Sequence, residues 1–134
     1  MTLTQESPYP AERGGGLRIP MPPHPVVAEQ ARALAEMMLA SWDLGFLTDD
    51  ALLVVSELVT NAMKLGEVFW FAICRQGRGV LIEATDTSPG IPKIEQADEM
   101  DVGGRGLLLV EAVSEECGVR YCHDGGKTVW ATVT

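Results

Sequence analysis

"SELVTNAMKLG", residues 56–66, is the stretch that decides how the rest of the chain is interpreted. Its apolar residues recur with helical spacing and predict a helix over about 49–64. Glu57, Asn61 and Lys64 stand at i, i+4 and i+7, so a carboxylate, an amide and an ammonium share one stripe of that helix. The stripe either faces water or holds a ligand. Asparagine is a mediocre helix former in mid-helix, and the rest of the chain has to decide between the two.

The overall composition is that of one ordinary globular domain. The 134 residues are 46% hydrophobic and 22% charged, and we expect residues 16–134 to form one domain after a loose polar tail, residues 1–15. A formal net charge of −9 argues against binding nucleic acid through a broad basic face. A small phosphorylated ligand stays open, because it needs only local donors.

The expected location is the cytoplasm, without a membrane partner. The chain has no apolar run of membrane-spanning length, and its N-terminus lacks a charged segment followed by an apolar one. Its three cysteines are odd in number and include no C-x-x-C pair, which favours a reducing compartment and small buried thiols.

The first half of the chain predicts an extended segment followed by two helices. The extended segment spans residues 17–21 and is stopped by prolines. The first helix follows Pro25, with core positions expected at 27, 31, 34, 38 and 42 and an end at Gly45. We expect Thr48 to cap the second helix, which would end at Gly66 and bury Leu52, Val55, Leu58, Val59 and Ala62.

The second half predicts two hairpins separated by a long loop and a third helix. Residues 67–85 form the first hairpin, and residues 119–133 form the second. Between them, 105–118 resumes a helix that would offer its core Leu107, Val110, Ala112, Val113 and Cys117. The predicted fold is therefore an α+β two-layer sandwich: a mixed, mainly antiparallel sheet with helices packed on one face.

Two glycine-rich pieces resemble parts of phosphate-binding motifs. "GGKT", residues 125–128, is not a P-loop, because Tyr121 replaces the required glycine and a strand follows instead of a helix. "GGRG", residues 103–106, opens a helix after a long loop. Such a helix start attracts phosphate, although a tight turn packed against the sheet explains the glycines equally well.

Three separated pieces together resemble a known family. "SELVTNAMK", "DTSP" with Gly90, and "GRGLLLV" occur in the order of the N box and the two glycine boxes of the GHKL, or histidine kinase-like, ATPases. With "GGKTVWATV", they are most similar to the small bacterial branch related to anti-sigma-factor serine/threonine kinases. The resemblance runs from about Leu17 to the end of the chain and implies the Bergerat ATP-binding fold.

The resemblance implies roles for the polar stripe. Asn61 would hold Mg²⁺ through its amide oxygen, which suits a hard cation bridging phosphates. Glu57 would be the base that accepts a proton from the attacking hydroxyl or orients a water. Lys64 would contact phosphate, with a surface lysine whose stem lies along the protein as the alternative.

The remaining pieces would bind the nucleotide. Asp86 would accept a hydrogen bond from the adenine amino group, although by itself it also suits a turn at the end of a strand. Gly90 would leave room beside the ring, and residues 91–103 would be the lid. Contacts with the phosphates are implied for Gly104, Arg105 and Gly106, and a hydroxyl near the nucleotide for Thr128.

The resemblance thus implies an ATP- and Mg²⁺-dependent serine/threonine protein kinase of the anti-sigma-factor type. Its protein partners would be a sigma factor and an anti-anti-sigma factor, the latter being phosphorylated. Homodimers are common in the resembled branch. The alternative is a non-catalytic module that binds ATP to control a protein partner; the carboxylate at Glu57 favours the kinase, since a pure binder needs no base.

Overall fold

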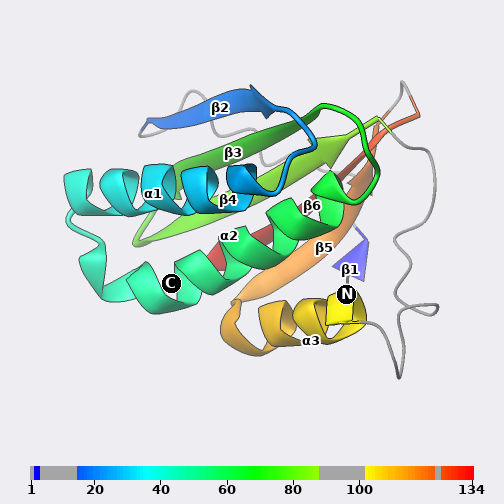
Figure 1. Ribbon diagram of the computed structural model, residues 1–134. Helices are drawn as coiled ribbons and strands as arrows, with labels where there is room; N and C mark the ends of the chain where they lie inside the picture. The colour runs from blue at the N-terminus through cyan, green and yellow to red at the C-terminus, as the bar shows by residue number, and fades with distance from the viewer. Residues whose placement is uncertain (1, 4–14, 88–101, 123–124) are drawn as a thin grey trace.

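The computed structural model describes residues 2–3, 15–87, 102–122 and 125–134, and their strands form one sheet (Figure 1). In chain order the elements are β1 Thr2–Leu3, β2 Gly16–Met21, α1 Val26–Ser41, the 3₁₀ helix η1 Gly45–Leu47, α2 Thr48–Met63, β3 Phe69–Gln76, β4 Gly79–Asp86, α3 Val102–Val113, β5 Glu116–Tyr121 and β6 Lys127–Val133.

The sheet has the strand order β1-β5-β6-β4-β3-β2. All neighbouring strands are antiparallel except β1 and β5, which are parallel. Figure 1 shows α1 and α2 lying across one face of the sheet, with α3 beside α2. The predicted sandwich with a mixed, mainly antiparallel sheet is therefore confirmed. The parallel strand β1, near the N-terminus, was not predicted.

The core fills the space between the helices and the sheet. In α1 the fully buried side chains are Val27, Ala31, Ala35 and Leu39. The predicted core positions Leu34, Met38 and Trp42 only pack against this core and stay partly exposed. Small alanines let α1 approach α2 closely, so the stripe turned inward is the one with small residues.

The ends of α1 and α2 differ from the prediction. The left-handed backbone conformation after α1 falls on Asp43, with φ 58°, and Gly45 instead begins η1. Aspartate tolerates this conformation better than most residues. Thr48 is the first residue of α2, not its cap, because η1 runs directly into the helix; its hydroxyl donates a hydrogen bond back to the Gly45 carbonyl at 2.7 Å. Gly66 follows α2 with a positive φ, as expected.

Both predicted hairpins are present, and α3 is displaced from its predicted range. β3 pairs with β4 around Gly77, and β5 pairs with β6. α3 begins at Val102 and ends at Val113, so Cys117 lies in β5 and not in a helix. Ala112, expected in the core, is exposed, whereas Leu107 and Val110 are buried. The chain leaves the helix early because β5 must pair with β6.

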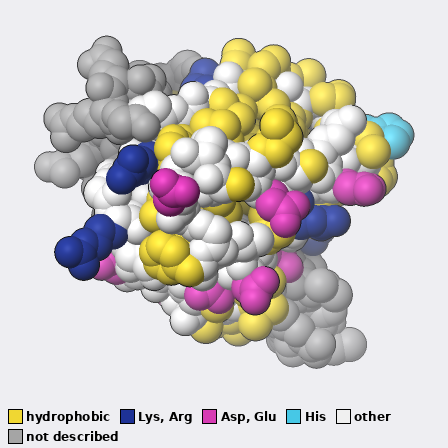
Figure 2. All heavy atoms as spheres, turned by 90° about the vertical axis from the view of Figure 1, so that its left-hand side faces the viewer, with side chains coloured by type: hydrophobic (Ala, Val, Ile, Leu, Met, Phe, Trp, Pro, Cys, Tyr) yellow, Lys and Arg dark blue, Asp and Glu magenta, His cyan; other side chains and the backbone are white. Residues whose placement is uncertain are grey.

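One end of the molecule exposes large apolar side chains. Met37 near the end of α1 is 67% exposed and Phe46 in η1 is 75% exposed. Figure 2 looks at this end and shows hydrophobic and acidic side chains side by side. Within the described residues, no helix is long and apolar enough to cross a membrane.

Candidate functional site

The predicted base, Glu57, lies where α2 meets α3. A Cβ atom added to Gly106 would stand 2.7 Å from Cδ of Glu57 and closer still to one carboxylate oxygen. Only a glycine at this position of α3 lets the carboxylate occupy that space. Glu57 itself is half-buried. The structure therefore brings the first and third predicted motifs into contact through Glu57 and Gly106.

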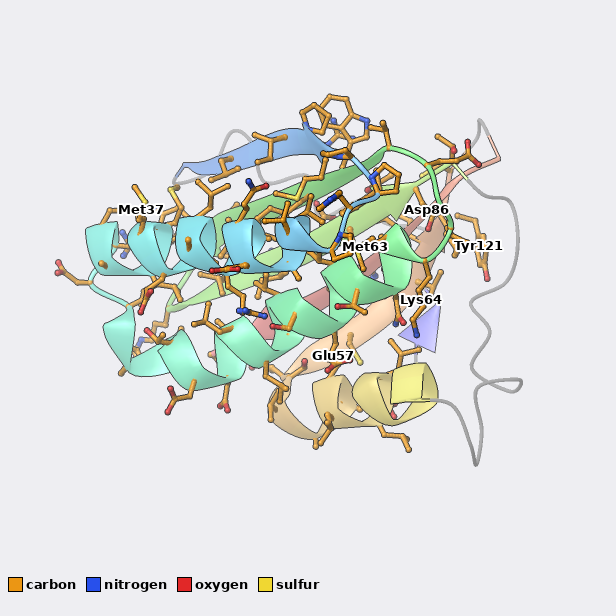
Figure 3. All side chains as sticks on the ribbon, viewed as in Figure 1. Met37, Glu57, Met63, Lys64, Asp86 and Tyr121 are labelled. Atoms are coloured by element: carbon orange, nitrogen blue, oxygen red, sulfur yellow. The ribbon has the colours of Figure 1, made fainter. Side chains whose placement is uncertain are left out.

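Asn61 and Lys64 continue the same stripe toward the end of α2. Asn61 is half-buried one turn beyond Glu57, and Lys64 is exposed as the residue that caps the helix. Figure 3 shows Glu57 and Lys64 on the side of α2 that faces α3. The amide oxygen of Asn61 is a hard ligand of the kind that Mg²⁺ accepts.

Asp86, the last residue of β4, is buried in an ion pair with Lys127, the first residue of β6. The lysine Nζ lies 3.2 Å from Oδ1 and 3.2 Å from Oδ2 of Asp86. The two residues are directly opposite each other in the register of β4 and β6. Figure 3 places Asp86 at the same end of the molecule as Lys64. The carboxylate that is predicted to recognise adenine is thus in contact with a lysine.

Thr128 is not brought together with Asp86. Its hydroxyl is 2.7 Å from the hydroxyl of Thr85, and its strand neighbour Lys127 takes the side of Asp86. Because side chains alternate along a strand, Thr85 and Thr128 lie on the face of the sheet away from the helices. The sulfur of Cys122 lies 3.9 Å from the Thr128 hydroxyl.

The other predicted site residues are described only in part. Gly104 and Arg105 lie within the first turns of α3, where the structure describes the backbone but not their side chains. Gly90, with the predicted lid over residues 91–103, lies outside the described residues except for the first two residues of α3. Their predicted contacts with a nucleotide stay predictions.

Three side chains form a row at the end of the sheet, and the sequence indicated only one of them, Asp86, as a site residue. Tyr121, Lys127 and Asp86 are successive partners across β5, β6 and β4, and Tyr121 is exposed. The available signal was the spacing of Lys127 from Val129 and Ala131, two and four residues on. That period of two places the lysine on the same face as two core residues.

A second buried ion pair lies on the opposite face of the sheet. Arg120 donates a hydrogen bond to Glu83 at 3.2 Å. Burial raises the pKa of Glu83 above its ordinary value, and the Arg120 guanidinium opposes that increase. This pair is separated from α2 and α3 by the sheet, so it is not part of the candidate site.

Comparison with known families agrees with this geometry. The family model described as histidine kinase-like ATPase domain matches residues 21–133. The chain belongs to the histidine kinase-like ATPase family. A search of curated proteins found no match.

Membership of the histidine kinase-like ATPase family implies ATP binding, usually with Mg²⁺. The residues present fit these groups. Asn61 supplies a hard amide oxygen from α2 for Mg²⁺, and because Gly106 has no side chain, the Glu57 carboxylate can lie against α3 as the base. Asp86 supplies a buried acceptor at the end of β4. Family membership also supports a regulatory, kinase-like role.

Proposed function

We propose that this chain is an ATP- and Mg²⁺-dependent serine/threonine protein kinase of the anti-sigma-factor type. It would bind a sigma factor and phosphorylate an anti-anti-sigma partner. The observation that supports the proposal best is the position of Glu57, whose carboxylate sits against Gly106 at the junction of α2 and α3. A module that only bound ATP would have no need for a carboxylate there.

Each of four site residues has a distinct role in the proposed reaction. Glu57 accepts the proton of the attacking serine or threonine hydroxyl, so the nucleophile becomes more reactive as the phosphoryl group transfers. Asn61 holds Mg²⁺, which supplies positive charge to the phosphates when bound. Lys64 adds a cation at the end of α2, and Asp86 orients the adenine ring of ATP. Positioning and electrostatics carry the reaction, without a covalent intermediate on the protein.

The test separates binding from transfer. Calorimetry measures ATP affinity with and without Mg²⁺, and radiolabelled ATP measures transfer to a purified anti-anti-sigma protein. We expect Glu57→Gln to lower the transfer rate by about 10²–10⁴-fold, because a general base contributes about that much, while ATP affinity changes little. Asn61→Ala should weaken binding only when Mg²⁺ is present.

The matched control is Glu36→Gln, which removes the same charge from an exposed position of α1. It should leave both binding and transfer unchanged. ATP binding without transfer by the wild type would reject the kinase and support the non-catalytic module. No ATP binding by the wild type would reject both.

A further inference from the structure

Lys127 is a buried lysine whose ammonium contacts both oxygens of Asp86. The side chains of Lys127 and Asp86 are only 6% and 7% exposed, and both N···O distances are 3.2 Å. Lysine is almost never buried without a partner, since removing its charge from water is costly. The pair is therefore a specific feature of this site, not a surface lysine that happens to lie near a carboxylate.

The pair lies on the same face of the sheet as α2. Ala84 and Val129 stand two residues from Asp86 and Lys127 on their strands, oppose each other in the register, and belong to the core beneath the helices. Side chains two residues apart along a strand share a face. Lys127 thus directs its side chain toward the side on which Glu57 and Asn61 lie.

One ammonium in contact with two carboxylate oxygens limits how the carboxylate can rotate. An ionised carboxylate offers about four acceptor positions, so contact with one ammonium does not use all of them. A carboxylate held in one orientation favours a ligand with a matching donor, because that ligand gains a hydrogen bond to a charged group that a ligand without the donor does not make.

We propose that Lys127 is a positioning residue for recognition of the adenine ring. It holds the Asp86 carboxylate in the orientation that accepts a hydrogen bond from the 6-amino group of an adenine nucleotide. This inference rests on the proposed function, in which Asp86 recognises the base. Lys127 acts through Asp86 and need not touch the nucleotide, so the property that depends on it is selectivity for the amino group.

The experiment compares two ligands that differ only in that group. Calorimetry measures the dissociation constants of ADP and of purine riboside 5′-diphosphate, which lacks the 6-amino group, with Mg²⁺ present. Wild type should prefer ADP by at least about tenfold, the discrimination expected from one hydrogen bond to a charged group. Lys127→Met should reduce that preference to less than about threefold, and Lys127→Arg should restore most of it.

The ratio of the two constants is the decisive readout. Partial unfolding of a variant lowers the apparent affinity for both ligands by the same factor. A purely structural role of Lys127 would therefore not change the ratio of the two dissociation constants. Lys127→Leu, which also removes both the donor and the charge, replaces Lys127→Met if circular dichroism shows that the methionine variant does not fold. It is judged by the same ratio.

Arg120→Met is the matched control. It breaks the Glu83–Arg120 pair, which has the same 3.2 Å distance and similar burial on the other face of the sheet. It should lower stability and leave the ratio unchanged. An unchanged ratio in Lys127→Met would overturn the inference, whereas ADP binding by the wild type would still support the proposed function. A wild type that bound neither ligand would overturn both.

Discussion

The Glu57 carboxylate occupies the space that a side chain on Gly106 would need. A side chain on Gly106 would have to displace the carboxylate, since the nearest atoms to an added Cβ all belong to Glu57. Glutamate is flexible at its far end, so the helices themselves can stay in place. The cost of a substitution there should therefore appear in the position of the carboxylate more than in stability.

Gly106→Ala tests this view. Alanine favours a helix over glycine by about 1 kcal/mol, which should offset the local crowding and keep the free energy of unfolding within about 1 kcal/mol of wild type. Phosphoryl transfer should fall by more than about tenfold, because the base is moved. Urea denaturation and the transfer assay measure the two effects.

Gly45→Ala is the control for Gly106→Ala, because an added Cβ there meets nothing within 4 Å. It should not affect transfer. Equal transfer by wild type and Gly106→Ala would show that the Glu57 carboxylate does not act from the position that the structure gives it.

Single residues also mark where sequence reasoning reached its limit. The spacing of Glu57, Asn61 and Lys64 on one helix was sufficient to place them together, because helical geometry is local. The pairing of Lys127 with Asp86 is not local, and the sequence indicated Thr128 instead of Lys127. The period of two places Lys127 on the face of Val129 and Ala131, but only the register with β4 shows that it lies opposite Asp86.

At the level of elements, the Glu83–Arg120 pair links two strands that are not neighbours. Glu83 belongs to β4 and Arg120 to β5, with β6 between them. The pKa of Glu83 is raised mainly by burial, so the folded protein binds this proton more tightly than the unfolded chain does. The contribution of this carboxyl to stability is therefore largest at low pH and is lost as pH rises from its ordinary pKa of 4.5 to the raised value.

Glu83→Gln makes that dependence measurable, because glutamine does not titrate. The free energy of unfolding of wild type minus that of the variant should decrease as pH rises above 4.5, then level off. Urea denaturation over a series of pH values gives the difference. Glu36→Gln, which removes an exposed carboxylate, corrects for the change in net charge. A difference that increased with pH would contradict the assignment.

The type of most elements followed from the sequence, whereas several boundaries did not. Apolar periodicity was enough for α1, α2 and both hairpins, since each depends on neighbours along the chain. The end of α3 depends on β5 pairing with a strand that comes later, and periodicity within 105–118 carries no information on that pairing. The two-residue β1 depends on a partner more than 100 residues away, which no local pattern indicates.

For the whole molecule, we propose that residues 16–134 unfold as one cooperative unit, and the cysteines can test this. Cys74 lies on the sheet face away from the helices, Cys117 lies in the main core, and both are buried, whereas Cys122 is half-buried. Burial raises the pKa of Cys74 to about 11 and also raises that of Cys117. Because the thiolate is the reactive form, both should resist modification until the protein opens.

Labelling with a thiol reagent should therefore show one fast thiol and two slow ones. The fast phase should disappear in Cys122→Ser. Mass spectrometry of the labelled peptides should find equal rates at Cys74 and Cys117, since opening of a single unit exposes both faces together. Faster labelling of Cys117 would instead show that β5 opens separately from the rest of the sheet.

The central position of β6 has a consequence for synthesis on the ribosome. It is the last strand of this sheet to be synthesised, yet it lies between β4 and β5 and pairs with both. A nascent chain that has not yet released residues 127–133 from the exit tunnel can form the β3–β4 hairpin, but β5 has no antiparallel partner to join. Because such distant pairings form slowly, the sheet should close only after translation of the domain is complete.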